Sequence, residues 1–259
     1  MTQPDRPAGR GHKLTPTPVK AAALEYGVPV YEPVSLKEFT AQHAGEAFDL
    51  FALASYGKIL PAALLALPKH GALNVHPSLL PKYRGATPIQ SALLNGDSET
   101  GVTIMLMDAG MDTGPIVLQE RTQVAPSEKY GELHDRLANF GAALLSKAMR
   151  STMDGSAVPH PQEGEPTVTK PIRKEELEID WKWNAKRIHN FVRAYAPAPV
   201  ARAKIQGLEV KILGTALAET PGAMRVPCGD GAVYVTRVVT SGKGPMSGAQ
   251  FEQSLGRNG

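Results

Sequence analysis

Residues 71–114 decide the fold, and they read GALNVHPSLLPKYRGATPIQSALLNGDSETGVTIMLMDAGMDTG. An apolar segment leads into Asn74 and His76, and a Pro-containing loop follows it. A β-rich run over residues 102–107 then precedes Asp112 in a Gly-rich turn. Asn74 and His76 are two residues apart, so on a strand they point to the same side. Ligands collect at the carboxyl ends of strands in open α/β sheets, so we expect these three polar side chains to form a site there.

Strand-like and helix-like segments alternate around this stretch, which predicts an α/β fold with a Rossmann-like, mostly parallel sheet. The continuous apolar run of residues 48–55 is typical of a buried parallel strand. Residues 108–114 resemble a hairpin turn between two further strands. The expected helices cover residues 16–26, 35–43, 64–67, 88–94 and 127–149, and the other expected strands cover residues 28–31, 101–107 and 115–120.

The pattern changes after a segment rich in Pro, Gly and Glu, which indicates a linker. We expect a catalytic domain over residues 1–152, a linker over 153–175 and a second domain over 176–259. The second domain begins with a helix ending near Tyr195 and continues in short β segments, typical of a small antiparallel, OB-like β-barrel. The segment 221–229 is about one strand shorter than expected, so this barrel is expected to be partial or frayed.

Composition places the chain among globular proteins. It has 259 residues, of which 42% are hydrophobic and 20% charged. A membrane span needs roughly 18 consecutive apolar residues, and the sequence has no such run. The single cysteine, Cys228, suits a reducing compartment, so we expect a cytoplasmic protein. The N-terminal residues contain no apolar run, so we expect no secretory signal. The net charge of +3 permits a nucleic-acid partner but does not require one.

Common cofactor motifs are missing from the sequence. It contains no Cys-x-x-Cys or His-x-x-x-His pairing, no P-loop and no GxGxxG fingerprint, so we expect no metal, ATP or NAD. Alone, Asn74 and Asp112 are most simply turn residues, and His76 a partly buried histidine. Their combination favours catalysis.

Two motifs resemble those of the folate-dependent formyltransferases: Asn74-Val75-His76-Pro77-Ser78-Leu79-Leu80-Pro81, and Asp112-Thr113-Gly114. The resemblance implies a formyltransferase fold and 10-formyltetrahydrofolate as the formyl donor. In the transfer it implies, Asn74 binds the developing oxyanion, His76 moves a proton and Asp112 orients the imidazole. The residues it implies for folate binding are Ala54, Ser55, Tyr56, Ser78, Leu79, Leu80 and Pro81.

The N-terminus resembles the loop that family members acting on methionyl-tRNA place against the acceptor stem. This implies initiator methionyl-tRNA as the partner of a monomeric enzyme, with Arg6, Arg10, His12 and Lys13 in contact with it. Composition alone favours a disordered terminus, because two prolines and two glycines oppose a packed element. Further landmarks lie at residues 179–181, 193–195, 228–231 and 243–247. The family's Trp after the second-domain helix is replaced by Ala198.

Relative to this family the chain is expected to lack the first strand, helix and strand. Either a misplaced start codon or a truncation accounts for this. Two alternative functions therefore stand beside formylation of methionyl-tRNA. One is a non-catalytic tRNA-binding relic, and the other is formyl transfer to a different amine, such as an amino sugar or glycinamide ribonucleotide.

Overall fold

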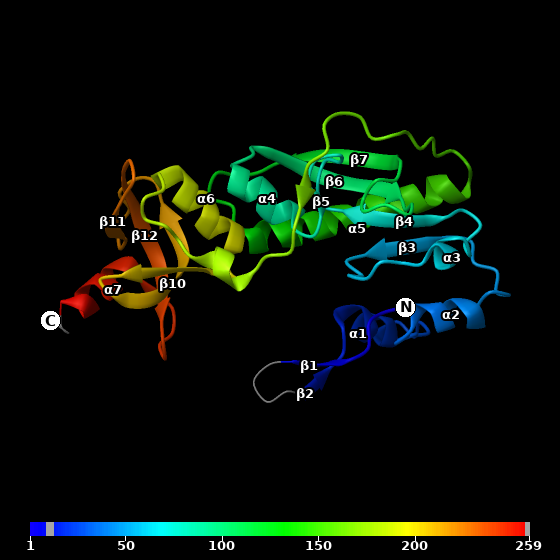
Figure 1. Cartoon of the computed structure of the whole chain (residues 1–259), viewed down its shortest axis with the longest axis horizontal. Coiled ribbons are helices and arrows are strands. Elements are labelled where there is room, and N and C mark those ends of the chain that lie inside the picture. Colours follow the sequence, from blue (N-terminus) through cyan, green and yellow to red (C-terminus); the bar gives the residue numbers. More distant parts are fainter. Residues whose placement is uncertain (9–12, 257–259) are drawn as a thin grey trace. The chain divides into compact units, whose positions relative to one another are not determined.

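The computed structural model describes residues 1–8 and 13–256 (Figure 1). The helices are α1 (Pro18–Glu25), α2 (Leu36–Gln42), α3 (Ala62–Leu65), α4 (Pro88–Asn95), α5 (Tyr130–Met153), α6 (Ala185–Tyr195) and α7 (Gly248–Leu255), with a 3-10 turn η1 (Lys174–Leu177). The strands are β1 (Arg6–Ala8), β2 (Lys13–Thr15), β3 (Phe51–Ala54), β4 (Ala72–His76), β5 (Arg84–Gly85), β6 (Glu99–Leu106), β7 (Ile116–Gln123), β8 (Val168–Thr169), β9 (Ala201–Ile205), β10 (Leu208–Ala216), β11 (Met224–Cys228), β12 (Gly231–Thr240) and β13 (Met246–Ser247). In the described parts of the chain, no helix is both long enough and apolar enough to cross a membrane.

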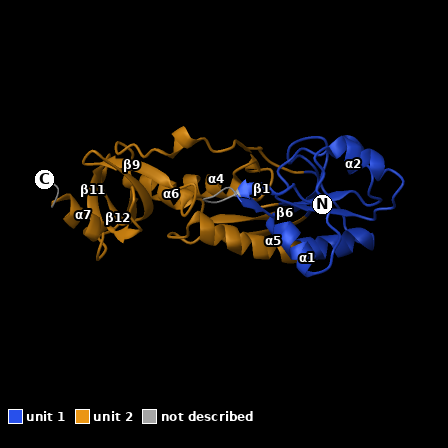
Figure 2. Ribbon diagram, turned by 90° about the horizontal axis from the view of Figure 1, so that it is seen from below, with its two compact units in different colours: residues 1–75, 104–117, 145–161 blue, residues 76–103, 118–144, 162–259 orange. Residues whose placement is uncertain are grey.

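The chain forms two compact units, coloured separately in Figure 2. The first comprises residues 1–75, 104–117 and 145–161, and the second comprises residues 76–103, 118–144 and 162–259. Several elements, including β4 and β6, run from one unit into the other.

The central sheet has the strand order β3-β4-β6-β7 (Figure 1). Strands β3 and β4 run parallel, with Phe51 opposite Ala72. Strands β6 and β7 form an antiparallel hairpin, since Leu106 N donates to Pro115 O at one end and Val124 N donates to Ser98 O at the other. The sheet is thus mixed, and the predicted α/β class and hairpin are confirmed.

Strand β6 runs opposite to β4. Met107 N donates to Ala72 O, so the end of β6 lies beside the start of β4. The Thr103 hydroxyl, nearer the start of β6, donates to Ser78 O just beyond the end of β4. Strand β6 is therefore antiparallel to β4, because the hairpin reverses the direction that a parallel sheet would give it.

Two predicted strands differ in the structure. Of the apolar run 48–55, only Phe51–Ala54 forms a strand, and its residues are alternately half-buried and exposed. This exposure follows from its place at the edge of the sheet, where β4 is its neighbour. Residues 28–31 form no strand, because Pro29 has no N–H to donate to a ladder. The Tyr31 carbonyl instead accepts a hydrogen bond from Thr2 N.

The C-terminal sheet has the order β11-β12-β10-β9, with β13 paired to β12, and all its pairs are antiparallel. Helix α6 packs into its core through residues at i, i+3, i+4 and i+7. These residues are Ile188, Phe191, Val192 and Tyr195. The Asn184 side chain caps the helix by accepting from Arg187 N.

Strand β11, which was not predicted, lies within residues 221–229 and pairs with β12. Met224 and Val226 point inward while Arg225 and Pro227 alternate with them, but five residues give only a weak period-2 signal. Helix α7 was also missed. It starts with a capping box between Ser247 and Gln250.

The predicted linker is fixed by several contacts to the loop that follows β4. Strand β8 pairs in parallel with β5, with Arg84 opposite Val168. A Cβ on Gly85 would lie 2.5 Å from the carbonyl oxygen of Thr169, and its φ of +106° also favours glycine. The close approach of these two backbones therefore depends on glycine at this position.

Candidate active site

Strand β4 carries two of the predicted catalytic residues. Gly71, with a φ of +79°, precedes the strand, and buried Ala72 and Leu73 fix it in the sheet. Asn74 is half-buried and His76 is only 4% exposed. The period of two places both side chains on the same side of the strand, as expected.

The ring of His76 is oriented by a backbone carbonyl. Its Nε2 lies 3.0 Å from Tyr83 O. A carbonyl oxygen only accepts hydrogen bonds, so Nε2 carries the proton in this contact. In the neutral ring, Nδ1 is then the nitrogen that can take up a proton.

Tyr83 is held in turn by the end of α4. Its hydroxyl donates to Asp97 Oδ2 at 2.7 Å and accepts from Asn95 Nδ2 at 2.8 Å. Burial raises the pKa of Tyr83 to about 12, so the hydroxyl keeps its proton at neutral pH. Tyr83 N also donates to the Thr167 hydroxyl, 84 residues further along the chain. The carbonyl that faces His76 is therefore fixed from both sides.

The loop between His76 and Tyr83 is organised by Thr103. Its hydroxyl donates to Ser78 O at 2.7 Å and accepts from Leu80 N at 3.2 Å. Gln119 Nε2 donates to Thr103 Oγ1 and to Leu80 O. Neither polar residue was predicted, although a threonine inside the apolar run of β6 is a signal that could have indicated one.

The predicted folate residues of this loop are partly internal. Ser78 is fully buried, and its hydroxyl donates to Lys82 O at 2.6 Å. Leu79, Leu80 and Pro81 line a cavity of about 550 Å³ in the second unit. The charged side chains of that cavity are mainly acidic: Asp97, Glu99, Glu163 and Glu165, against Lys82 and Arg121. This balance does not suit the carboxylate tail of a folate.

Asp112 lies in the turn after β6, in the first unit. It is half-buried and has a φ of +54°. The turn is shaped by Asp108, whose Oδ1 accepts from Gly110 N at 2.9 Å and from the Thr113 hydroxyl at 2.7 Å. A Cβ on Gly114 would overlap the carbonyl oxygen of Leu106, so the turn requires glycine there. Sequence reasoning identified Asp112 and missed the turn-forming role of Asp108.

The other predicted folate residues follow β3 in the first unit. Ala54 and Ser55 are exposed, and Ser55 has a φ of +48°. The Tyr56 hydroxyl is buried and has no hydrogen-bond partner among the described protein atoms. Burial raises the pKa of Tyr56, so the hydroxyl stays protonated. A ligand that offers an acceptor would satisfy it, which fits a folate wall.

The N-terminal segment is more ordered than expected. Strands β1 and β2 pair antiparallel and expose Arg6 and Lys13, whereas Arg10 and His12 lie outside the described residues. Thr2 is buried, so the expectation of a disordered start is wrong for residues 2–8. It failed because it weighed Pro and Gly content without these long-range contacts.

A lysine fixes the base of this hairpin. Lys20 Nζ lies 2.8 Å from a Glu32 carboxylate oxygen and 2.9 Å from an Asp5 oxygen. The hydrogen bonds that Lys20 donates to the carboxylates of Glu32 and Asp5 raise the pKa of Lys20. Gln3 Nε2 donates to Tyr56 O at 2.7 Å, which ties the same segment to the end of β3. Neither Gln3 nor Lys20 was predicted, because their partners are distant in sequence.

Metal-binding side chains do not cluster in the part of the chain that the structure describes. Residues 1–8 and 13–256 contain no group of three His, Cys, Asp or Glu side chains that could hold an ion. Cys228 lies 3.5 Å from Asp230 Oδ1, in the C-terminal sheet.

Comparisons with known proteins give matches over nearly the whole chain. The family described as "Formyl transferase" matches residues 1–149, and "Formyl transferase, C-terminal domain" matches residues 171–256. A methionyl-tRNA formyltransferase from Roseobacter denitrificans is 42% identical over 260 residues, covering 96% of this chain and 85% of the relative. The enzyme of the same name from Chromohalobacter salexigens is 44% identical, covering 92% of this chain and 78% of the relative.

Solved structures share the fold at lower identity. An N-formyltransferase from Helicobacter canadensis, in complex with folinic acid and dTDP-3-aminofucose, has a TM-score of 0.66 at 20% identity. The match covers 90% of this chain and 86% of that one. HypX from Aquifex aeolicus, in complex with tetrahydrofolic acid, has a TM-score of 0.60 at 20% identity, covering 78% and 38% of the two chains.

Proposed function

The chain belongs to the formyl transferase family, and we propose that it transfers a formyl group from 10-formyltetrahydrofolate to the amino group of initiator methionyl-tRNA. This is the activity in the names of relatives that are 42–44% identical over more than nine-tenths of the chain. The observation that carries the proposal for this chain is β4, which places half-buried Asn74 and buried His76 on one side of a strand.

Asn74 and His76 divide the chemistry of acyl transfer between them. 10-Formyltetrahydrofolate supplies the formyl carbon, the new bond forms to the amino nitrogen, and the bond to the folate nitrogen breaks. The formyl oxygen gains negative charge during attack, and the Asn74 amide N–H donates to it. The amine loses a proton and the folate nitrogen gains one, and His76 moves this proton through Nδ1.

The backbone contact of His76 supports its role. Because Nε2 donates to Tyr83 O, the neutral ring presents an unprotonated Nδ1 for the proton that leaves the amine. We propose that the Asp112 carboxylate stabilises the imidazolium that forms, as a nearby anion favours the charged form. No covalent nucleophile is needed in this scheme.

We propose that folate contacts Ala54, Ser55, Tyr56 and the loop of Ser78, Leu79, Leu80 and Pro81. The unpartnered Tyr56 hydroxyl supports the first group. The fully buried Ser78 supports a role in shaping the loop, and Leu79, Leu80 and Pro81, which line the cavity of the second unit, are the proposed contacts. The proposed domain limits are 1–152, 153–175 and 176–259.

We propose that tRNA contacts the basic hairpin through Arg6, Arg10, His12 and Lys13, and also contacts the C-terminal sheet. The exposure of Arg6 and Lys13 supports this, since phosphate contacts need accessible cations. We further propose a monomeric cytoplasmic enzyme, and the single cysteine is compatible with a reducing compartment.

The test is formyl transfer by the 259-residue chain with 10-formyltetrahydrofolate and charged initiator tRNA. Asn74→Ala serves as the chemical control, and an amino sugar nucleotide and glycinamide ribonucleotide serve as alternative acceptors. Formylmethionyl-tRNA formed by the wild type and lost with Asn74→Ala supports the proposal. Transfer to another acceptor alone indicates a different substrate. Binding of tRNA with no transfer to any acceptor indicates a relic.

A further inference from the structure

Helix α6 places a buried arginine against backbone carbonyls from the other matched family segment. Arg193 is 5% exposed and lies in residues 171–256, the segment matched by the C-terminal family. Its guanidinium lies 3.4 Å from Leu93 O, Ala125 O and Glu128 O, all in the segment matched by the N-terminal family. Burial lowers its pKa, but an arginine remains charged at any physiological pH. Its guanidinium therefore joins the two segments.

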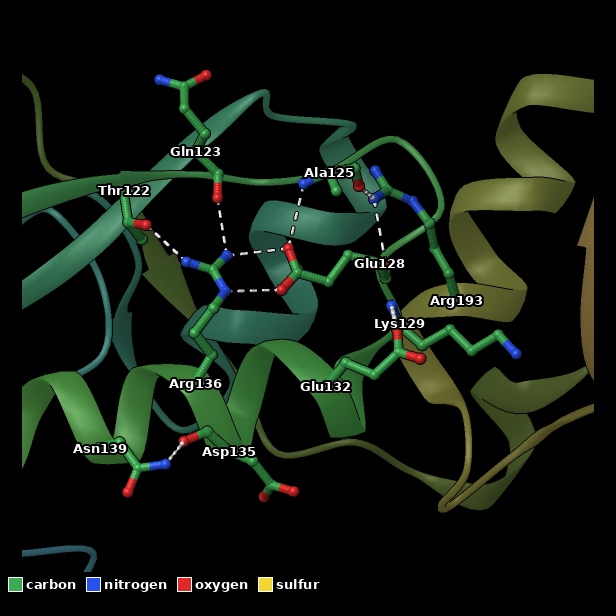
Figure 3. Close-up of polar contacts among 10 residues, drawn as sticks. All are labelled: Thr122, Gln123, Ala125, Glu128, Lys129, Glu132, Asp135, Arg136, Asn139 and Arg193. Carbon is green, nitrogen blue, oxygen red and sulfur yellow. Dashed lines mark hydrogen bonds and ion pairs between the residues drawn. The ribbon is translucent and has the colours of Figure 1, made fainter.

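A second arginine, Arg136, fixes the loop whose carbonyls, Ala125 O and Glu128 O, face Arg193 (Figure 3). Arg136 donates to both carboxylate oxygens of Glu128, at 2.8 and 2.9 Å, and to Gln123 O at 2.7 Å. Glu128 Oε2 also accepts from Ala125 N. The loop that carries Ala125 O and Glu128 O is thus fixed by contacts independent of α6.

Two neighbours of Arg193 on α6, His189 and Asn190, contact the same two regions. These contacts of α6 with the end of α4 and with residues 125–128 are called the joint. His189 lies 3.3 Å from Pro126 O and 3.0 Å from the Thr215 hydroxyl. Asn190 is 7% exposed, accepts from Arg193 Nε at 3.1 Å and donates to Leu94 O at 3.5 Å. A Cβ on Gly96 would lie 2.6 Å from Asn190 Nδ2, so this close packing also requires glycine.

The end of α4 that Arg193 contacts also makes a hydrogen bond to Tyr83, whose carbonyl lies beside His76. Leu93 and Leu94 accept from α6, and one residue further Asn95 donates to the Tyr83 hydroxyl. The carbonyl of Tyr83 lies 3.0 Å from His76 Nε2. A continuous series of contacts within the second unit therefore leads from α6 to His76.

We infer that Arg193 is a positioning residue: it fixes the end of α4 so that Tyr83 holds His76 in the orientation needed for proton transfer. Burying a guanidinium against neutral carbonyls is an expensive way to gain stability. One planar guanidinium can, however, make directional contacts both to Leu93 O at the end of α4 and to the carbonyls of Ala125 and Glu128. This inference rests on the proposed function, since it assigns His76 a catalytic role.

The experiment compares Arg193→Lys with Arg173→Lys in the full chain. Lysine keeps the charge at position 193 but cannot contact Leu93 O together with Ala125 O and Glu128 O. Arg173 is exposed and pairs with Glu176 in η1, outside the joint, so its variant is a matched control. We expect Arg193→Lys to lower kcat roughly two- to thirty-fold, the range for mutations along a coupled network, and Arg173→Lys to leave it unchanged.

A double-mutant cycle with Tyr83→Phe tests the route. Tyr83→Phe removes the hydroxyl bonds to Asn95 and Asp97, so the double variant is expected to lose less activity than the product of the single losses. Losses that multiply would overturn the route through Tyr83. If Arg193→Lys fails to fold, Asn190→Ala replaces it in the same cycle.

A readout without turnover separates this inference from the proposed function. The NMR signals of the His76 imidazole are expected to move in Arg193→Lys and to stay in place in Arg173→Lys. If the wild type does not formylate methionyl-tRNA, the proposed function fails and these signals still decide the positioning role. Unchanged His76 signals together with wild-type kcat in Arg193→Lys would reduce Arg193 to a structural residue and overturn the inference.

Discussion

Helices α1 and α6 begin with the same kind of side-chain N-cap but differ in how strictly their apolar residues lie on one face, and they have different structural roles. Both have a side-chain N-cap, Thr17 in α1 and Asn184 in α6, and both carry apolar residues at helical spacing. Yet α6 buries seven of its eleven residues, whereas α1, with eight residues, buries none. The apolar residues of α6 are confined to one face more strictly than those of α1, so the strength of the periodicity and the partner surface together decide how much of a helix is buried.

The two regions also use different contacts to hold functional groups. Around α6 the fixing contacts are buried and made largely to backbone carbonyls, as at Arg193. Around α1 they are ion pairs, as between Lys20 and its two carboxylates. The region of α6 is therefore expected to determine stability and geometry, and the region of α1 to affect mainly the hairpin that it supports.

The largest contrast is expected in stability. Ile188 is fully buried in α6 and Val19 is 57% exposed in α1. Ile188→Ala should lower the free energy of unfolding by about 2–5 kcal/mol, because it removes buried methyl groups and leaves a cavity. Val19→Ala should change it by less than about 0.5 kcal/mol. Denaturant unfolding of both variants measures this, and equal losses would break the distinction between the helices.

The next contrast separates chemistry from binding. Asn74→Ala should lower kcat by roughly 10²–10³-fold, the usual effect of removing an oxyanion donor. His76→Ala and Asp112→Ala should also abolish most transfer, while Arg10→Ala should mainly weaken the use of tRNA. Steady-state kinetics with varied tRNA concentration resolve kcat from KM. Wild-type kcat in any of the three catalytic variants would contradict the proposed mechanism.

The placement of Asn74 and His76 on one strand was predictable because its signals are local. Asn74 and His76 two residues apart on a strand, and Gly96 as the left-handed end of α4, follow from short-range patterns. The contacts that fix the site were not predictable, because Tyr83 meets Thr167 and Arg193 meets Leu93 across 84 and 100 residues. The edge position of β3 was missed for the same reason. An apolar run predicts a strand but not the number of its neighbours.

The two regions should also respond to opposite ends of the pH scale. Burial tends to raise the pKa of Glu128, but the hydrogen bonds from Arg136 and Ala125 N and the charges of Arg136 and Arg193 together lower the pKa below 4.5. Its stabilisation is therefore present above pH 4.5 and lost as pH falls through the lowered value. The pKa of Lys20 is raised above 10.5, so its contribution is present below that pH and lost as pH rises through the raised value.

Hydrogen exchange at the two sites measures this difference. Acidification should increase amide exchange in residues 124–129 of the wild type, relative to the rate of an unfolded chain at the same pH. This response should be absent in Glu128→Gln. The exposed Glu219→Gln serves as the control and should behave as the wild type does. Alkaline pH should increase exchange in residues 2–5 first. If acidification increased exchange in residues 2–5 and alkaline pH increased it in residues 124–129, the assignment of the two responses to Glu128 and Lys20 would be wrong.

The smallest expected effect concerns the hairpin itself. Lys13 is exposed on β2, and Lys69, also exposed, lies between α3 and β4. Loss of one phosphate contact in Lys13→Ala should reduce the slope of log affinity for tRNA against log salt by about 1 and leave kcat unchanged. Lys69→Ala should keep the wild-type slope. If both variants keep it, tRNA does not contact β2, and the hairpin beside α1 has no part in substrate binding. A reduced slope only in Lys13→Ala would show that the hairpin beside α1, a region with little buried surface, contributes to tRNA affinity through its charge.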